Sequence, residues 1–158
     1  STFIAQNFGA GQMKRIRDGI RVAVVSATIF CVFISLLVFA FARPLMLIFV
    51  PVHETEIISI GVQYLRIEGA FYCGIGCLFL LYGFYRGIRK PGMSVVLTVI
   101  SLGTRVALAY ALSAIPAIGV VGIWWSIPIG WFLADIVGLW YYRRLFSRVT
   151  RSGILKSV

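Results

Sequence analysis

The chain has 158 residues, of which 60% are hydrophobic and only 13% are charged. A water-soluble domain keeps about a quarter of its residues charged, so this composition argues against a soluble globular protein. Lysine and arginine outnumber the acidic residues by 15 to 5, which gives a formal net charge of +10. The basic residues cluster between apolar runs, which is typical of a membrane protein with several spans and not of a groove that follows nucleic-acid phosphates.

The first twelve residues, STFIAQNFGAGQ, have apolar side chains at the spacing expected for the last turns of a helix that begins upstream. Glycine accepts the positive φ that a helix C-cap needs, so we expect Gly9 and Gly11 to end this helix. The basic stretch 14–21 follows, with isoleucines at helical spacing. This pattern predicts a short helix on the membrane surface.

Residues 22–42 contain no charged side chain. At about 1.5 Å per residue, such a helix crosses the roughly 30 Å hydrocarbon core of a bilayer. A cleaved signal peptide is the alternative, because basic residues precede the run and 40–42 reads Ala-Phe-Ala. A signal peptide has an apolar run of only about 7 to 15 residues, and three more apolar runs follow here, which favours a membrane span. Arg43-Pro44 then predicts a kink or an end of the helix.

Three further spans are predicted, at 58–85, 93–115 and 119–142. The polar segment before the first of them contains His53, which we interpret as a solvated surface residue, with a proton relay as the alternative. At the end of the 58–85 span, Gly83 and Gly87 are four residues apart, and this spacing lets helices approach each other closely. Its aromatic side chains are explained either by a wall for flat cationic compounds or by contact with lipid.

Charged side chains within the spans are costly and tend to face protein or a water-filled cavity. Arg105 is near the middle of the third span, Glu68 is near the outer end of the second, and Asp135 is in the fourth. We expect Arg105 to pair with Glu68 rather than with Asp135, because arginine extends toward its nearer membrane surface. An arginine that reaches water without a partner is the alternative. Pro128 predicts a bend in the fourth span.

Orientation follows from three basic segments, namely 14–21, 86–90 and the tail 143–158. Four spans place all three on one side, which is therefore the predicted cytoplasmic side. The tail is expected to lie against the anionic leaflet.

Three cysteines, Cys31, Cys73 and Cys77, all lie inside apolar runs. Cys73 and Cys77 share a helix face but have no histidine or acidic neighbour in the sequence, so we interpret them as packing residues and not as metal ligands. We expect neither a metal site nor enzymatic activity.

Three motifs together carry a family resemblance. AQNFGAGQ at 5–12, followed by a basic stretch and a long apolar helix, resembles the end of the second helix in each half of MATE-type multidrug exporters. RGIRKP at 86–91 resembles the connection between the fourth and fifth helices of a lobe, and GVVGIW at 119–124 resembles the start of the last helix. The motif residues that we expect to be structural are Gln6, Asn7, Gly9, Gly11, Arg86 and Gly87.

The resemblance implies an all-α membrane protein with four complete transmembrane helices and the end of a preceding one. Residues 1–142 would be the C-terminal part of a six-helix lobe, and 143–158 a cytoplasmic tail. The implied location is the bacterial inner membrane. The implied partners are membrane lipids, a missing N-terminal lobe and a cationic or amphipathic small molecule, without nucleic acid.

The function implied is multidrug or toxin efflux by an antiporter that uses a sodium or proton gradient and no cofactor. Some branches of the family have an acidic residue in the middle of the tenth helix, where this chain has Cys73-Gly-Ile-Gly-Cys77. We therefore expect the coupling acids outside this chain, which alone should not transport. The candidates for the substrate cavity are Tyr72, Phe71, Glu68, Arg105 and Asp135.

Two other functions remain open. A flippase for lipid-linked oligosaccharides or polysaccharides shares the architecture, and a cavity rich in cationic side chains would favour it. A membrane scaffold without transport activity is the other, and it predicts tightly packed helices with no polar side chain facing a cavity.

Overall fold

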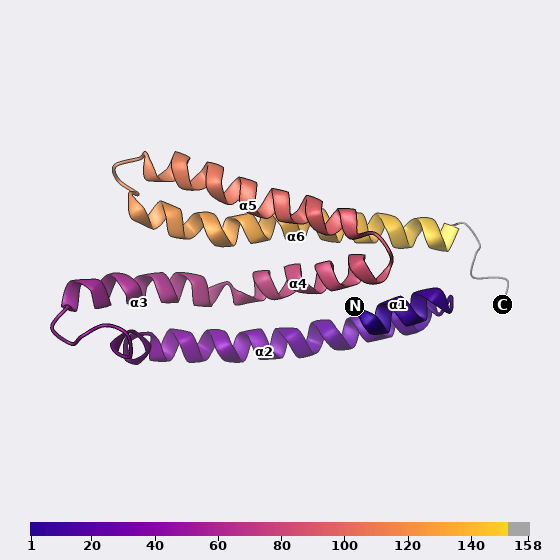
Figure 1. The fold of residues 1–158 in the computed structure, drawn as a ribbon, viewed down its shortest axis with the longest axis horizontal. Coiled ribbons are helices and arrows are strands. Elements are labelled where there is room, and N and C mark those ends of the chain that lie inside the picture. The colour runs from indigo at the N-terminus through magenta and orange to yellow at the C-terminus, as the bar shows by residue number, and fades with distance from the viewer. Residues whose placement is uncertain (152–158) are drawn as a thin grey trace.

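The computed structural model describes residues 1–151, with the side chains of residues 1–147. Every element of the described part is an α-helix, which confirms the predicted all-α architecture. In Figure 1, α2 follows one edge of the molecule, α3 and α4 lie end to end along the middle, and α5 and α6 form an antiparallel pair on the far side. The helices are α1 (Thr2–Gly9), α2 (Met13–Leu47), α3 (Thr55–Ala70), α4 (Tyr72–Gly87), α5 (Pro91–Ser113) and α6 (Val120–Arg151).

Three of these helices, α2, α5 and α6, are each long and apolar enough to cross a membrane. Together α3 and α4 meet the same criterion, but their axes are bent by 48° relative to each other. The count of four spans is reached only if this bent pair is one span. The predicted span at 58–85 therefore consists of two helices joined at a bend.

The break between α3 and α4 lies at Phe71, whose φ of −111° and ψ of 15° are not helical. The Phe71 N–H donates to the Glu68 carbonyl at 3.2 Å, and the Gly74 N–H donates to the Phe71 carbonyl at 2.9 Å. Both bonds join residues three apart, so the backbone groups around the break remain satisfied. Glycines on both sides of it lower the intrinsic helix propensity of the segment.

Helix α2 begins at Met13 and continues without a break into the first span. The predicted separate surface helix at 14–21 is therefore wrong, because these residues are the first turns of α2. A kink at Phe41, where φ is −103° and ψ is 17°, precedes Pro44 by three residues. Proline lacks the N–H that would bond to the preceding turn, which explains why the distortion lies on its N-terminal side.

The end of α1 is a helix cap built on one glycine. Gly11 has a φ of +69°, the Gln12 N–H donates to the Asn7 carbonyl at 2.8 Å, and the Gly11 N–H donates to the Phe8 carbonyl at 3.2 Å. These two bonds define a Schellman cap with Gly11 in the left-handed position. Gly9 is the last helical residue and does not have a positive φ, so its predicted role as a left-handed cap is wrong.

Helix α4 ends in the same way, although without glycine. Arg89 has a φ of +59°, the Lys90 N–H donates to the Tyr85 carbonyl at 2.8 Å, and the Arg89 N–H donates to the Arg86 carbonyl at 3.2 Å. A side chain with a Cβ in the left-handed region carries a steric cost of about 1–2 kcal/mol. The chain thus turns into α5 through a strained residue.

Helices α5 and α6 pack closely along a line of small residues. A Cβ on Gly122 would lie 2.6 Å from the Leu112 Cβ, and one on Gly130 would lie 2.6 Å from the Ser101 carbonyl oxygen. Small side chains let helices approach within a membrane, where no hydrophobic force drives them together. Helix α6 continues past Pro128 as one element. The line consists of buried residues at every fourth position: Gly122, Ser126, Gly130, Ala134 and Gly138.

Helix α1 lies against α4 at the glycines predicted to allow close approach. A Cβ on Gly87 would lie 2.7 Å from the Ile4 Cγ2, whereas one on Gly83 would meet its nearest neighbour, the Ser1 nitrogen, at 3.8 Å. This end of the bundle also contains much of the buried core, including Ile16, Phe84, Tyr85 and Ile88. The region predicted as a tail is helical through Arg151, and 152–158 lie outside the described residues.

Candidate transport site

Two carboxylates are buried within the predicted spans. Glu68 of α3 and Asp135 of α6 are each 7% exposed. The Glu68 Oε1 and the Asp135 Oδ1 have no hydrogen-bond partner among the described residues. Acidic groups inside a membrane are costly, and such groups mark sites of ion or substrate passage. Both positions were candidates from the sequence.

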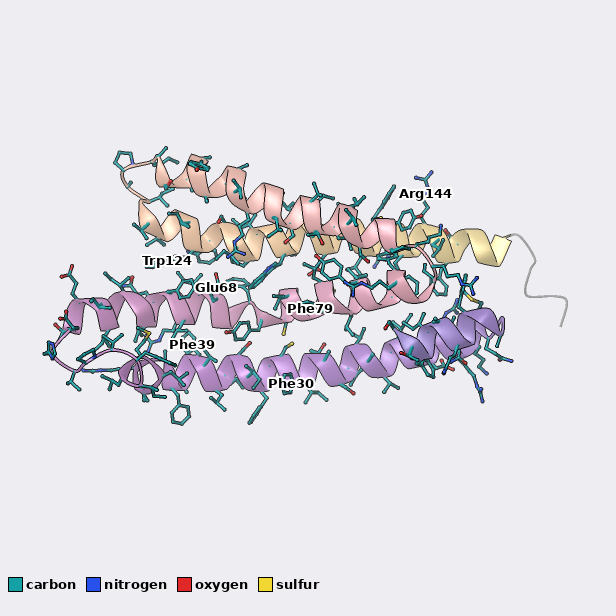
Figure 2. The ribbon with its side chains drawn as sticks, in the orientation of Figure 1. Phe30, Phe39, Glu68, Phe79, Trp124 and Arg144 are labelled. Atoms are coloured by element: carbon teal, nitrogen blue, oxygen red, sulfur yellow. The ribbon has the colours of Figure 1, made fainter. Side chains whose placement is uncertain are left out.

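Glu68 faces a cluster of aromatic and charged side chains from three helices. Figure 2 shows Glu68 of α3 and Trp124 of α6 on the facing sides of these two helices. Tyr64, one turn before Glu68, packs edge-on against Trp124 with 5.9 Å between ring centroids. Electrostatic interactions join Tyr64 to both Glu68 and Arg105. We call Tyr64, Glu68, Arg105 and Trp124 the Glu68 cluster.

Arg105 of α5 is half-buried and lies against the line of small residues of α6. Its Cβ would be 3.5 Å from a Cβ on Gly130, so Gly130 provides the room that brings the arginine next to α6. The guanidinium is close enough to Glu68 for the two charges to attract each other. The expected Arg105–Glu68 ion pair is nevertheless not formed, since the ion pair recorded among the described side chains joins His53 and Glu54 at 3.6 Å.

The two aromatic candidates lie at the break between α3 and α4. Phe71 is 39% exposed and packs edge-on against Trp125 with 5.5 Å between centroids. Tyr72 is half-buried and interacts electrostatically with Tyr64. Two neighbouring tryptophans of α6 thus contact aromatic rings of the α3 region, Trp124 at Tyr64 and Trp125 at Phe71. The sequence argument missed Trp124 and Trp125, although adjacent tryptophans at the start of an apolar span are a signal that could have indicated them.

Asp135 lies apart from the Glu68 cluster and faces α4. Its Oδ2 is 4.0 Å from the position of a Cβ on Gly74, and the Cys77 thiol is its side-chain neighbour. No interaction within the described part of the chain joins Asp135 to Arg105 or Glu68. The candidate acids are therefore two separate sites. Cys73 and Cys77 are free thiols, and Cys77 has an acidic neighbour that the sequence alone did not indicate.

The motif residues occur at helix ends. The Asn7 side-chain amide donates to the Phe3 carbonyl at 2.8 Å, while Gln6 and Arg86 are exposed. Gly11 forms the cap of α1, Gly87 contacts α1, and the Arg86 carbonyl accepts a hydrogen bond in the cap of α4.

A cavity of about 720 Å³ lies between α1, α2, α4 and α6. Its lining is almost entirely apolar and includes Ile20, Phe79 and Leu139. Cys77 also lines it, but none of the five candidate cavity residues does. The predicted candidates therefore lie outside this cavity, on α3, α4, α5 and α6.

The sequence matches one protein-family model. The family model MatE matches residues 1–111, which cover α1 to α4 and nearly all of α5. Neither the search of curated proteins nor the search of solved structures found a match. In the part of the chain that the structure describes, no group of three or more histidine, cysteine, aspartate or glutamate side chains could hold a metal ion.

Proposed function

This chain belongs to the MatE family of membrane transporters, and we propose that it forms part of a cation-coupled antiporter that exports drugs or toxins. The main support for the proposal is the Glu68 carboxylate. It is buried, has an oxygen without a partner among the described residues, and interacts electrostatically with Tyr64, whose ring packs against Trp124. A carboxylate flanked by aromatic side chains is suited to an organic cation. The membrane-spanning helices around it provide the apolar surroundings that an amphipathic compound needs.

The Glu68 cluster would recognise such a compound through two interactions. The Glu68 carboxylate attracts the positive charge, and the rings of Tyr64 and Trp124 supply cation–π contacts worth about 0.5–2 kcal/mol each. Arg105 competes for the same carboxylate, because its charge already attracts Glu68 without forming an ion pair. Departure of the substrate would leave Arg105 as the counter-charge of Glu68.

The remaining parts of the proposal concern the whole transporter. It would use a sodium or proton gradient, with coupling acids in an N-terminal lobe, and would lie in the bacterial inner membrane with its basic end in the cytoplasm. Lipids, that lobe and the exported compound are its partners. Basic residues at the α1–α2 and α4–α5 connections, which lie at one end of the bundle in Figure 1, support this orientation.

The test measures efflux of a flat organic cation, ethidium, from cells that contain the intact transporter. Glu68→Gln keeps the shape of the side chain and removes its charge, and we expect it to reduce efflux at least tenfold, as loss of about 1.4 kcal/mol of binding would. Glu56→Gln is the matched control, because Glu56 is an exposed acid in the first turn of the same helix. Equal efflux by both variants at equal expression would reject the proposal.

A lipid-linked oligosaccharide flippase is the second candidate, and the observation that favours it is Arg105, a basic side chain without an ion pair inside the bundle. Arginine binds the oxygens of a pyrophosphate head group in bidentate fashion. Arg105→Gln should then abolish flipping of a fluorescent lipid-linked oligosaccharide in vesicles. Absence of both efflux and flipping from the unmodified transporter would point to the scaffold function.

A further inference from the structure

Asp135 of α6 is a buried acidic side chain at the described contact between α4 and α6. It is 7% exposed, and its Oδ1 has neither solvent contact nor a hydrogen-bond partner. On the opposite helix, a Cβ on Gly74 would lie 4.0 Å from the Asp135 Oδ2 and 3.6 Å from the Trp131 Cβ. These are ordinary van der Waals distances, so the Asp135 carboxyl group and Trp131 pack directly against α4 at Gly74.

Among the described side chains, no cation forms an ion pair with this carboxylate. The titratable group that faces it from α4 is Cys77. The charged side chain of α5 that faces α6 is Arg105. It lies against Gly130, which precedes Asp135 by about 7.5 Å along the axis of α6. The charged side chain of α3 near this site is Glu68, which is attracted to Arg105. Among the described side chains, none of these groups forms an ion pair with Asp135.

An ionised carboxylate in such surroundings is costly, because it has lost its water and gained no opposite charge. A bound proton removes that cost without any other change in the structure. A cavity is close by, since Cys77 contacts Asp135 on one side and lines the 720 Å³ cavity on the other. Enclosure, lack of a counter-charge and a neighbouring cavity are the features of a site that exchanges protons.

We propose that Asp135 is a proton-binding site, and that loss of its proton loosens the contact of α6 with α4 at Gly74 and Cys77. The site takes a single proton from water that enters along the cavity. This inference rests on the proposed function in one respect, because it gives the antiporter a titratable group within this chain. An ionised Asp135 would draw water toward the α4–α6 contact, and the Cys77 thiol would become accessible with it.

The first test follows the alkylation of Cys77 by N-ethylmaleimide in the intact transporter in lipid vesicles, as a function of pH. Replacing Cys31 and Cys73 with serine leaves Cys77 as the thiol of this chain. A matched variant keeps Cys73 instead, an exposed thiol one turn earlier on α4, and so corrects for the ordinary pH dependence of thiols. We expect the ratio of the Cys77 rate to the Cys73 rate to rise several-fold with pH, and Asp135→Asn to abolish the rise. An unchanged rise in Asp135→Asn would overturn the proposal.

The second test detects the proton itself by infrared spectroscopy of the same vesicles. A protonated carboxyl group has a carbonyl stretch that an ionised one lacks, and we expect this band to disappear as pH rises. It should be absent from Asp135→Asn and retained in Glu68→Gln. If Asp135→Asn does not fold, Asp135→Glu should keep a displaced band, and a band unaffected by that change would reject the assignment. Neither readout requires substrate, so a failure here is distinguishable from the loss of efflux in Glu68→Gln.

Discussion

The hydroxyl group of Tyr85 donates a hydrogen bond of 2.6 Å to the backbone carbonyl of Gly138. Tyr85 is fully buried, and the close approach of the two helices at this point depends on Gly138, since a Cβ there would lie 2.6 Å from the Leu81 Cδ1. The bond thus joins α4 to α6 at the end of the bundle where the core is most enclosed. It directly joins two helices through residues that are 53 positions apart in the chain.

We expect Tyr85→Phe to lower the free energy of unfolding by about 1 kcal/mol, which is the net value of one such hydrogen bond. Thermal unfolding in detergent measures the change. Tyr110→Phe is the control, because Tyr110 is 77% exposed and its substitution should have no effect. Equal melting temperatures for both variants would contradict the role given to the Tyr85 hydroxyl.

The contact of α1 with α4 depends on Gly87 and not on Gly83. A methyl group on Gly87 would meet Ile4 at 2.7 Å and the Ser1 carbonyl oxygen at 3.0 Å, whereas one on Gly83 finds ordinary contact at 3.8 Å. We therefore expect Gly87→Ala to destabilise the protein by about 1–3 kcal/mol through overpacking, and Gly83→Ala to be neutral. Limited proteolysis between α1 and α2 reports whether α1 has detached. Similar proteolysis of both variants would show that α1 is not held at this position.

Gly11→Val should lower stability by about 1–2 kcal/mol, because a β-branched residue is strained at a φ of +69°. Gly9→Val tests the same change one residue inside the helix, where the added side chain meets nothing within 4 Å. We expect its cost to be limited to the difference in helix propensity, which does not penalise valine relative to glycine. Folded yield and melting temperature should therefore separate the two variants.

Arg89→Gly should raise stability by about 0.5–1 kcal/mol. The substitution removes the left-handed strain at the end of α4 and keeps both hydrogen bonds of the cap, although glycine also gains entropy in the unfolded chain. Arg89 is exposed, so little packing is lost. A lower melting temperature would mean that the Arg89 side chain contributes an interaction worth more than the strain it causes.

The two ends of the bundle should lie on opposite sides of the membrane. Glu54 is in the α2–α3 connection and Arg86 is near the α4–α5 connection, at opposite ends of the view in Figure 1. We expect an impermeant maleimide added outside cells to label Glu54→Cys and not Arg86→Cys. Labelling of both positions from the same side would reject the four-span topology.

Much of this arrangement follows from local patterns in the sequence. Runs without charge predicted the spans, the Gly83–Gly87 spacing predicted a close helix contact, and Gly11 predicted a helix end. The break at Phe71 was not predictable in this way, because the apolar run continues through it and only the neighbouring helices decide where the backbone leaves helical geometry. Arg105 is attracted to Glu68 and not to Asp135, as the sequence argument expected, but among the described side chains the two charges do not form an ion pair. The depth of a residue along its span can be read from the sequence, whereas the distance between two side-chain ends cannot.

The bend at Phe71 determines how far the end of α3 would move if the angle between α3 and α4 changed. Helix α3 has 16 residues and is therefore about 24 Å long. It acts as a lever about the break, so a rotation of about 10° there would displace the far end near Thr55 by about 4 Å along an arc of that radius. The other arm, α4, is held by α1 at Gly87 and by α6 at Gly138. A small change of the bend angle would therefore displace the Thr55 end of α3 more than the end of α4 at Gly87.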